Sequence, residues 1–564
     1  MASHRRGRGA PIIVGNGRGT VTVTDHATVN APEAASGSMH DVVILGGGLA
    51  GLTLALQLHD AYPDLDIVVL ERGTHPLPAA AHKVGESTVD VGAHYFGEVL
   101  GLRDYLKREH ILKFGLRYFF SDGRSDIDQV TELGVSEVFP APSYQLDRGI
   151  FENFLGAEAH RRGIDLREGT RVRGFDLGKG DAQHRVRCSS PEGDFELDAR
   201  WLVDASGRAG LVRRRLDLTV DNGHRVNAAW FRIDERLQLD DWIDDPVWRA
   251  RCKPPERWRS TNHLCGAGYW VWLIPLASGA HSVGIVADAA MHPLNTFNDF
   301  ERALAWLEEH QPAVAREVAK RRDKLLDFRF LKNYSHGCSK VFSADRWALT
   351  GEAGAFLDPF YSPGSDFIGI ANTFICQLIG HDRAGTPLAP HVRLYERLYQ
   401  SFYDSMLAIF RGQYPLFGNV RVMATKIIWD HAFYWGVLCQ LVFQQRLGDA
   451  ALFADLGTEL AYAQQLNERM QQLFRDWHPF SPPTNQPVML DQRELPWFTA
   501  LNVAMHDTLD DAGVRARLRE NVQLLRGLAA SIVERAVFDG GESLREGHED
   551  LLVEPGQPAL FVTP

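Results

Sequence analysis

The stretch DVVILGGGLAGLTLAL, residues 41–56, decides the fold of this chain. Its apolar run at 42–45 predicts a buried parallel strand, and the apolar residues after the last glycine predict a helix. Between them lie Gly46, Gly48 and Gly51. In a Gly-x-Gly-x-x-Gly turn the first glycine permits the bend, the second admits a pyrophosphate to the backbone, and the third lets helix and strand pack closely. The helix N-terminus adds free N–H groups for phosphates.

An acid and two further glycine segments extend this unit. Residues 67–70 predict a second strand that ends in Glu71, where a carboxylate is expected to meet ribose hydroxyls. WLVDASG (201–207) predicts a buried strand that ends at Asp204, with a strand-ending Asx turn as the alternative interpretation of that aspartate. RWALTGEAGAFLDPFYSPG (346–364) predicts another strand, turn and helix. The three segments together indicate a flavoprotein that binds FAD with separate parts of its backbone.

The order of these elements predicts an α/β fold with a discontinuous Rossmann-type FAD-binding domain. We expect this domain over residues 39–385, with an inserted β-sheet substrate domain at about 210–340. Residues 386–564 have helical periodicity and predict a mainly helical C-terminal region. Residues 1–38 are basic, small and polar, and predict a disordered leader, although 21–29 could instead form a strand.

Composition excludes several classes of function. The chain has 564 residues and a net charge of −12, so it lacks the basic excess of a nucleic-acid-binding protein. Its six cysteines are scattered singly, which favours reduced thiols in the cytoplasm and predicts no metal site. No apolar run is long enough to span a bilayer. The most apolar C-terminal stretch, 433–443, predicts a buried core helix, with a membrane-facing surface as the lesser alternative.

Three further motifs connect the chain to a known family. They are HKVGEST (82–88), WVWLIP (270–275) and a Phe-x-x-Pro-x-x-Ser-x-Gly pattern at 356–364. With the glycine turn, they resemble the flavin-dependent halogenases, within the wider superfamily of single-component aromatic monooxygenases. The resemblance covers roughly residues 40–380.

The resemblance implies a reaction and a catalytic residue. In the family, a separate flavin reductase supplies reduced FAD, and oxygen and a halide then yield hypohalous acid. That acid reaches a lysine beside an aromatic substrate. Lys113 opens the strand-like segment KFGLRYFF after the VGEST motif, and the resemblance implies that it is this lysine. Lys83 and Lys107 are weaker candidates, and an ordinary surface lysine at 113 is the alternative.

The resemblance also implies a set of residues around the flavin. Trp270 and Trp272 lie two apart, so they face the same side of a strand, where they would separate flavin from substrate. Plain core packing is the alternative for both tryptophans. The other implied cofactor-binding residues are Gly85, Glu86, Ser87, Arg148, Asp204, Gly351, Glu352, Asp358 and Pro359.

The last motif departs from the family at two points. Tryptophan halogenases carry a glutamate between the Pro and the Ser, and here Phe360 and Tyr361 occupy those positions. A phenol-like or carrier-bound ring is therefore expected as substrate in place of free tryptophan. The family binds halide with two N–H groups after the Ser, but Pro363 has none. We therefore expect the halide site to shift to Gly364 and Ser365.

Two other functions remain open at this point. One is an FAD-dependent monooxygenase or dehydrogenase on the same scaffold without halide use. The other is a flavin-binding redox sensor without turnover. The sequence leaves the identity of the substrate and the preferred halide open.

Overall fold

The first sheet is built from strands that lie far apart in the sequence. Its central order is β7-β2-β1-β10, and every pair in that series is parallel. β18 adds to the other side of β10, also in parallel, while β8 and β9 extend the sheet as an antiparallel hairpin. The strands are β1 (Ser38–Leu45), β2 (Ile67–Leu70), β7 (Asp165–Arg167), β8 (Arg171–Asp176), β9 (His184–Ser190), β10 (Gly193–Asp204) and β18 (Trp347–Leu349).

The structure, a computed structural model, describes residues 38–78, 83–121, 123–124, 126–482 and 484–552. The expected leader at 1–38 lies outside this part except for Ser38, and so does the possible strand at 21–29.

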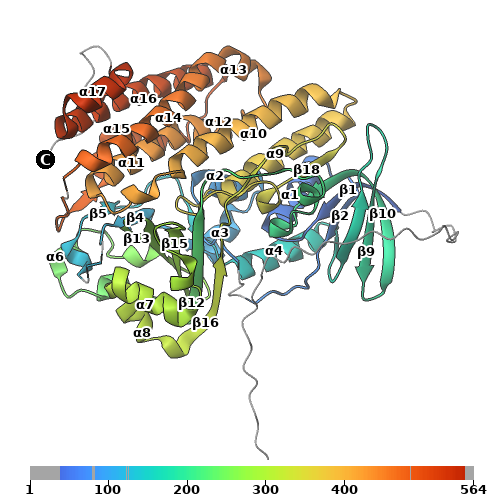
Figure 1. Cartoon of the computed structure of the whole chain (residues 1–564). Helices are drawn as coiled ribbons and strands as arrows, with labels where there is room; N and C mark the ends of the chain where they lie inside the picture. Colours follow the sequence, from blue (N-terminus) through green and yellow to red (C-terminus); the bar gives the residue numbers. More distant parts are fainter. Residues whose placement is uncertain (1–37, 79–82, 122, 125, 483, 553–564) are drawn as a thin grey trace, which may run out of the picture. The chain divides into compact units, whose positions relative to one another are not determined.

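Helices cover the first sheet in the way that a dinucleotide-binding fold requires. α1 (Leu49–Ala61) follows the glycine turn and packs against α4 (Arg148–Arg161) and α9 (Gly364–Arg383). Figure 1 shows these helices beside the strands β1, β2 and β10. Residues 42–45 are at most 1% exposed, because layers of helix cover both faces of the strand. The prediction of a discontinuous α/β unit is confirmed.

The second sheet has strands from three regions of the chain. Five of them come from the inserted region predicted at about 210–340, but β4 and β5 precede that region and β19 belongs to the C-terminal part. The sheet therefore extends beyond the predicted insertion. Its order is β16 (Leu325–Leu331), β12 (Val226–Ile233), β15 (His281–Asp288), β14 (Tyr269–Pro275), β13 (Thr261–Gly266), β4 (Leu116–Phe119), β5 (Glu132–Gly134) and β19 (Met489–Asp491).

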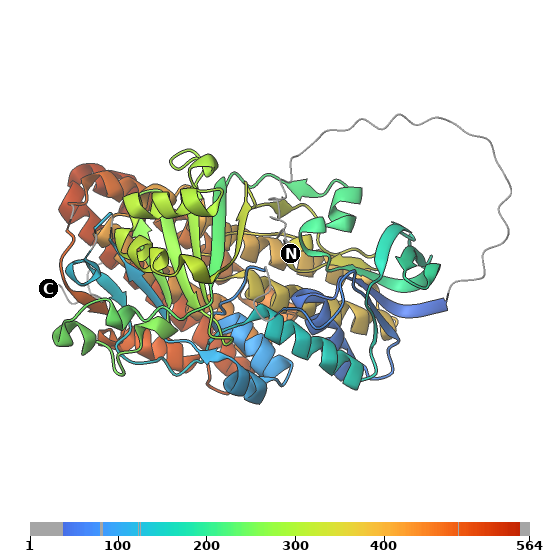
Figure 2. The same ribbon diagram turned by 90° about the horizontal axis from the view of Figure 1, so that it is seen from below.

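One face of this sheet is closed by two short helices. α7 (Phe300–His310) and α8 (Pro312–Ala319) pack their apolar sides on the strands, and they share one apolar core with β12, β14 and β15. Figure 2 shows the pair lying across the sheet. The opposite face of the sheet belongs to the large core of the molecule.

The C-terminal region is helical, as predicted. Its longest members are α10 (Leu388–Phe410), α11 (Val420–Phe433), α14 (Gly457–Trp477) and α16 (Asp511–Gly540). α11 continues into a π-helical turn, η10 (Tyr434–Cys439), whose residues are all buried. The stretch 433–443 is therefore helical throughout, as predicted, with π geometry at 434–439 and the α-helix α12 (Gln440–Phe443) after it, and only Phe443 is partly exposed. In the described part of the chain, no helix combines the length and apolarity that a membrane crossing demands.

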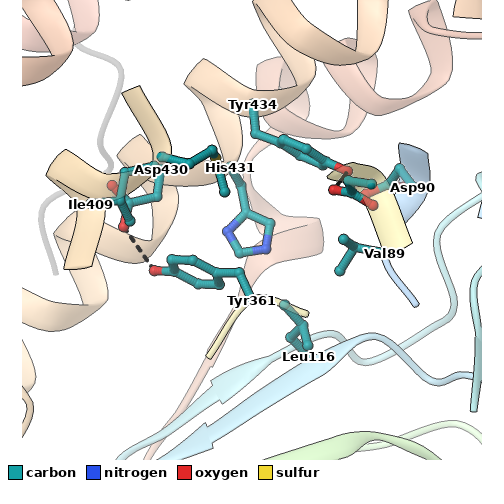
Figure 3. A pocket seen from close by; sticks show the side chains of 10 residues that line it. Val89, Asp90, Leu116, Tyr361, Ile409, Asp430, His431 and Tyr434 are labelled. Carbon is teal, nitrogen blue, oxygen red and sulfur yellow. Dashed lines mark hydrogen bonds between the residues drawn. The ribbon is translucent and has the colours of Figure 1, made fainter. Parts of the chain in front are cut away.

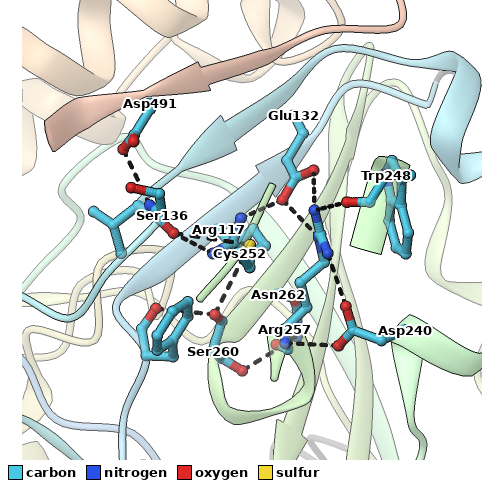
Figure 4. Close-up of polar contacts among 12 residues, drawn as sticks. Arg117, Glu132, Ser136, Asp240, Trp248, Cys252, Arg257, Ser260, Asn262 and Asp491 are labelled. Atoms are coloured by element: carbon cyan, nitrogen blue, oxygen red, sulfur yellow. Dashed lines mark hydrogen bonds and ion pairs between the residues drawn. The ribbon is translucent and has the colours of Figure 1, made fainter. Parts of the chain in front are cut away.

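A buried ion cluster holds β4 and β5 in place. Glu132 accepts hydrogen bonds from both Arg117 and Arg257, and Arg257 also pairs with Asp240. Figure 4 shows the guanidinium groups of the two arginines on either side of the Glu132 carboxylate. The side chains of Arg117, Glu132 and Arg257 are fully buried, so each charge depends on its partners for the solvation that water would provide.

Replacement of Glu132 by Gln should destabilise the protein strongly. Both buried arginines would lose their counter-charge, and breaking a buried pair in this way costs about 3–5 kcal/mol. Urea unfolding of Glu132→Gln measures this change. The matched control is Glu256→Gln, which removes the partner of the less buried Arg259 and should cost about 0–1 kcal/mol. Equal effects of the two substitutions would show that the cluster contributes no special stability.

Candidate active site

The glycine turn leaves open space where a pyrophosphate would lie. A Cβ at Gly51 would lie 1.9 Å from the Gly46 carbonyl oxygen, and one at Gly46 would lie 2.5 Å from the Ala205 oxygen. A Cβ at Gly48 would instead meet only Glu152 Oε2, at 4.0 Å. Gly48 also precedes α1, whose first N–H groups have no side-chain cap. These features fit the phosphates of FAD.

The acid of the second strand lies against the same turn. Glu71 accepts hydrogen bonds from the N–H groups of Gly47 and Gly73, each at 2.7 Å. Its carboxylate is therefore fixed next to the glycine turn, at the end of β2. This is the position from which an acid reaches the ribose of a bound dinucleotide.

The two other glycine segments, 201–207 and 346–364, also lie close to the glycine turn. Asp204 ends β10 and accepts hydrogen bonds from the N–H groups of Ser206 and Val212, so its carboxylate fixes the local turn. Gly351 has a φ of +61°, and a Cβ there would approach Ala50 of α1 to 3.0 Å. Burial raises the pKa of Glu352, although Arg208 and Arg148 lie near it. The structure thus brings all three segments together.

The VGEST segment is held by two arginines. Arg148 donates to the Val84 carbonyl and pairs with Glu152, and it lies 2.9 Å from where a Cβ of Gly85 would be. Glu86 is ion-paired with buried Arg232 at 2.8 Å. Arg148 and Glu86, which were predicted to bind the cofactor, therefore also hold the VGEST loop that carries Ser87.

Lys113 lies at the inner end of this loop. It precedes β4 by three residues, and its own N–H is bonded to the Ser143 carbonyl. The Nζ atom donates to Ser87 Oγ and to the Thr88 carbonyl, each at 2.8 Å. The residue is 2% exposed, and burial lowers the pKa of its amine to about 7, while Asp90 and Asp366 oppose that shift. The amine therefore changes charge near neutral pH.

Two adjoining cavities open beside Lys113, and Figure 3 shows the first of them. They share the wall residues Val89, Asp90, Leu116 and His431. The first cavity reaches the last motif and is also lined by Tyr361, Met406, Ile409, Asp366, Asp430 and Tyr434. The second contains Lys113 and has about 500 Å³ of atom-free space, part of it open to solvent; its wall includes Phe139, Trp435, Gln492 and Asn502.

Several of these wall residues were missed from the sequence. Asp90 follows the VGEST motif by only two residues, and this closeness in the sequence is a signal that could have indicated it. His431, Tyr434 and Trp435 are polar or aromatic positions within an apolar helix of the C-terminal region. They lie outside the part of the chain that carries the family resemblance, and only the fold brings them to Lys113.

The two tryptophans stand in an aromatic wall. Their ring centroids are 5.7 Å apart, as expected for residues on one side of β14, and both are at most 4% exposed. Trp270 Nε1 donates to the Tyr414 hydroxyl at 3.0 Å, and Tyr414 donates to Asp358 at 2.6 Å. Asp358 also pairs with His224 at 2.7 Å. The tryptophan motif is thereby bonded to the turn at Asp358 and Pro359.

The last motif leads directly into α9. Ser362 has a φ of +56°, Pro363 precedes the helix, and Gly364 begins it. A Cβ at Gly364 would meet no atom within 4 Å, so its backbone faces open space. The Ser365 hydroxyl lies 2.2 Å from the position of a Cβ at Gly92 and has no hydrogen-bond partner in the described part of the chain. The open donors at these two positions are therefore the N–H groups of Gly364 and Ser365 and the Ser365 hydroxyl.

Comparisons with known proteins agree with this arrangement. The FAD binding domain family matches residues 39–279. Flavin-dependent halogenase chlA of Dictyostelium discoideum is 26% identical over 71% of this chain and 70% of its own length. The 1H-pyrrole-2-carbonyl-[peptidyl-carrier protein] chlorinase of Pseudomonas fluorescens is 25% identical over 58% of this chain and 72% of its own.

The solved structure of halogenase PltM in complex with phloroglucinol and FAD shares the fold. It superposes with a TM-score of 0.59 over 91% of this chain and 97% of its own, at 17% identity. Together these matches cover the FAD-binding domain, the second sheet and much of the helical region.

The glycine turn allows a direct test of cofactor binding. Gly48→Val should leave the apoprotein folded, because the side chain enters space that no protein atom fills. The same side chain would occupy the pyrophosphate position and weaken FAD binding at least tenfold. Fluorescence titration with FAD measures this loss. Gly457→Val, at the start of α14, is the control, because its side chain also enters open space but lies in the C-terminal region, and it should leave FAD affinity unchanged. Unchanged FAD affinity in folded Gly48→Val would contradict the assignment.

Proposed function

Because the chain belongs to the flavin-dependent halogenase family, we propose that Lys113 delivers the halogen to an electron-rich aromatic substrate in the second cavity. Bound reduced FAD, supplied by a separate flavin reductase, provides the oxygen chemistry that oxidises the halide. The glycine turn and Glu71 hold the dinucleotide, and the VGEST loop joins its site to the amine. FAD-dependent monooxygenation without halide, and a redox sensor without turnover, are not favoured by these relatives.

The observation that carries this proposal is the buried amine of Lys113 in the wall of the second cavity. An ammonium group donates hydrogen bonds to hypohalous acid, and a neutral amine accepts the halogen or a proton. Because the pKa of Lys113 is about 7, both forms are present at neutral pH. Ser87 and Thr88 fix the direction of the Nζ atom.

The cavity favours a single aromatic ring as substrate. Its wall is largely apolar, with a few polar groups at defined positions, which is typical of a site for a small aromatic molecule. A phenol-like ring or a ring presented by a carrier protein fits this description. The chlorinase of Pseudomonas fluorescens acts on a carrier-bound pyrrole, and the PltM complex contains phloroglucinol.

We place the halide at the N-terminus of α9. The N–H groups of Gly364 and Ser365 lie in the first turn of a 20-residue helix, where the helix dipole favours an anion. Pro363 removes the donor that would precede them. With one donor fewer, the site replaces less of the hydration of the ion, and the more easily desolvated bromide should be preferred over chloride.

Replacement of Lys113 by Ala should abolish halogenated product while reduced FAD still consumes oxygen. The reason is that the flavin site and the amine lie on different elements. Product is measured by mass spectrometry with resorcinol, bromide and a flavin reductase, and oxygen uptake with an electrode. Lys107→Ala, on the exposed side of α3 (Arg103–Glu109), is the control and should retain full product. Normal halogenation by Lys113→Ala would reject the role of this lysine.

Replacement of Pro363 by Ala restores the missing backbone N–H group and should change the preference between bromide and chloride. Pro363 has helical φ and ψ angles of −74° and −4°, so alanine fits without strain and adds an N–H. At equal bromide and chloride, the wild type should give mostly brominated resorcinol, and Pro363→Ala should lower the bromide-to-chloride product ratio severalfold. Pro387→Ala, before α10, is the control and should leave the ratio unchanged. Equal use of both halides by wild type and Pro363→Ala would place the halide elsewhere.

A further inference from the structure

His431 stands where the two cavities meet. It lies in the last turn of α11, three residues before the π-helical turn η10 begins at Tyr434. Figure 3 shows its imidazole ring projecting between Tyr361 and Val89 into the space beside Asp90. π-helical turns of this kind are frequent at functional sites, because they present side chains that a regular helix would direct elsewhere.

The π-helical turn also fixes two carboxylates of the cavity wall. Trp435 Nε1 donates to Asp90 Oδ2 at 3.0 Å, and the Tyr434 hydroxyl donates to Asp366 Oδ2 at 2.7 Å. Asp430, next to His431 in the sequence, is bonded to Tyr361 at 2.8 Å and to Lys426 at 2.6 Å. These carboxylates therefore already have donors from the protein.

One atom of His431 is a hydrogen-bond acceptor with no partner. Its Nδ1 lies 2.8 Å from the Ile427 carbonyl oxygen, which can only accept, so Nδ1 carries the hydrogen. Nε2 is then a lone-pair acceptor, and it has no hydrogen-bond partner in the described part of the chain. Burial lowers the pKa of His431, which keeps the ring neutral despite nearby Asp90 and Asp430. An unpaired acceptor in a cavity calls for a donor on the ligand.

We propose that Nε2 of His431 recognises the hydroxyl group of a free phenol and thereby places its ring before Lys113. This inference rests on the proposed function, because it assigns the substrate of the same cavity. The ring would lie among Phe139, Trp435 and Leu116, which supply apolar and aromatic surface. A pyrrole or indole could donate only through its ring nitrogen, and an aryl ether could donate nothing.

His431 and Lys113 together supply and accept every proton that the halogenation of the phenol requires. The phenol passes its hydroxyl proton to Nε2 as its ring carbon attacks the halogen of hypohalous acid. The carbon–halogen bond forms, the halogen–oxygen bond breaks, and the Lys113 ammonium protonates the departing hydroxide to water. The ring then loses its C–H proton to the neutral Lys113 amine, and His431 returns its proton to the phenolic oxygen. The halogen is reduced and the ring oxidised by two electrons.

Binding measurements test the recognition without turnover. Calorimetry compares resorcinol with 1,3-dimethoxybenzene in the wild type, His431→Phe and His431→Gln. The wild type should bind resorcinol about tenfold more tightly, as expected for one added hydrogen bond. His431→Phe keeps a ring but no acceptor and should abolish this preference, whereas His431→Gln keeps an acceptor and should retain part of it. His381→Gln, at the far end of α9, is the matched control.

Halogenation rates test the proton transfer. His431→Gln should lower the rate with resorcinol about a hundredfold, since an amide accepts a hydrogen bond but does not take up the proton. Its rate with indole should stay within about twofold of the wild type. Equal binding of resorcinol and its dimethyl ether by the wild type would overturn the inference. An equal loss of the halogenation rate with indole in His431→Gln would also overturn the inference, because it would show that His431 only maintains the structure of the site. If the wild type prefers resorcinol over its dimethyl ether but forms no bromide-dependent product, the recognition by His431 stands and only the proposed halogenase function is refuted.

Discussion

The burial of the Lys113 amine is the constraint on which the rest of the site depends. An amine that is 2% exposed needs hydrogen-bond acceptors, and Ser87 and the Thr88 carbonyl provide them. That requirement ties the lysine to the VGEST loop, which Arg232 and Arg148 hold through Glu86 and Val84. One short segment, the VGEST loop, therefore connects the proposed flavin site to the proposed substrate cavity.

The C-terminal helices supply the rest of the cavity wall and part of the hydrogen-bond network. They supply His431, Tyr434 and Trp435 to the cavity wall, and Tyr414 to the hydrogen-bond series between Trp270 and Asp358. The second sheet likewise depends on β19 from the same region. The FAD-binding domain alone therefore contains neither the full second sheet nor the full cavity.

Much of the fold followed from the sequence because local signals determined it. The glycine turn, the strand ending at Asp204 and the helix after Pro363 each have a motif within a few residues, and each formed as predicted. The extra strands of the second sheet and the position of His431 in the cavity wall could not be foreseen, because they depend on contacts between residues hundreds of positions apart. Glu86 shows a further limit: its motif indicates proximity to flavin, whereas its bond to Arg232 is visible only in three dimensions.

The central claim is that this site transfers halogen and not oxygen to an aromatic ring. Its most direct test is mass spectrometry of resorcinol after incubation with the wild-type protein, FAD, a flavin reductase, NADH, oxygen and bromide. The account predicts a monobrominated product with the isotope doublet of bromine, absent when bromide is omitted. A hydroxylated product that forms equally with and without bromide, with no brominated species, would contradict it.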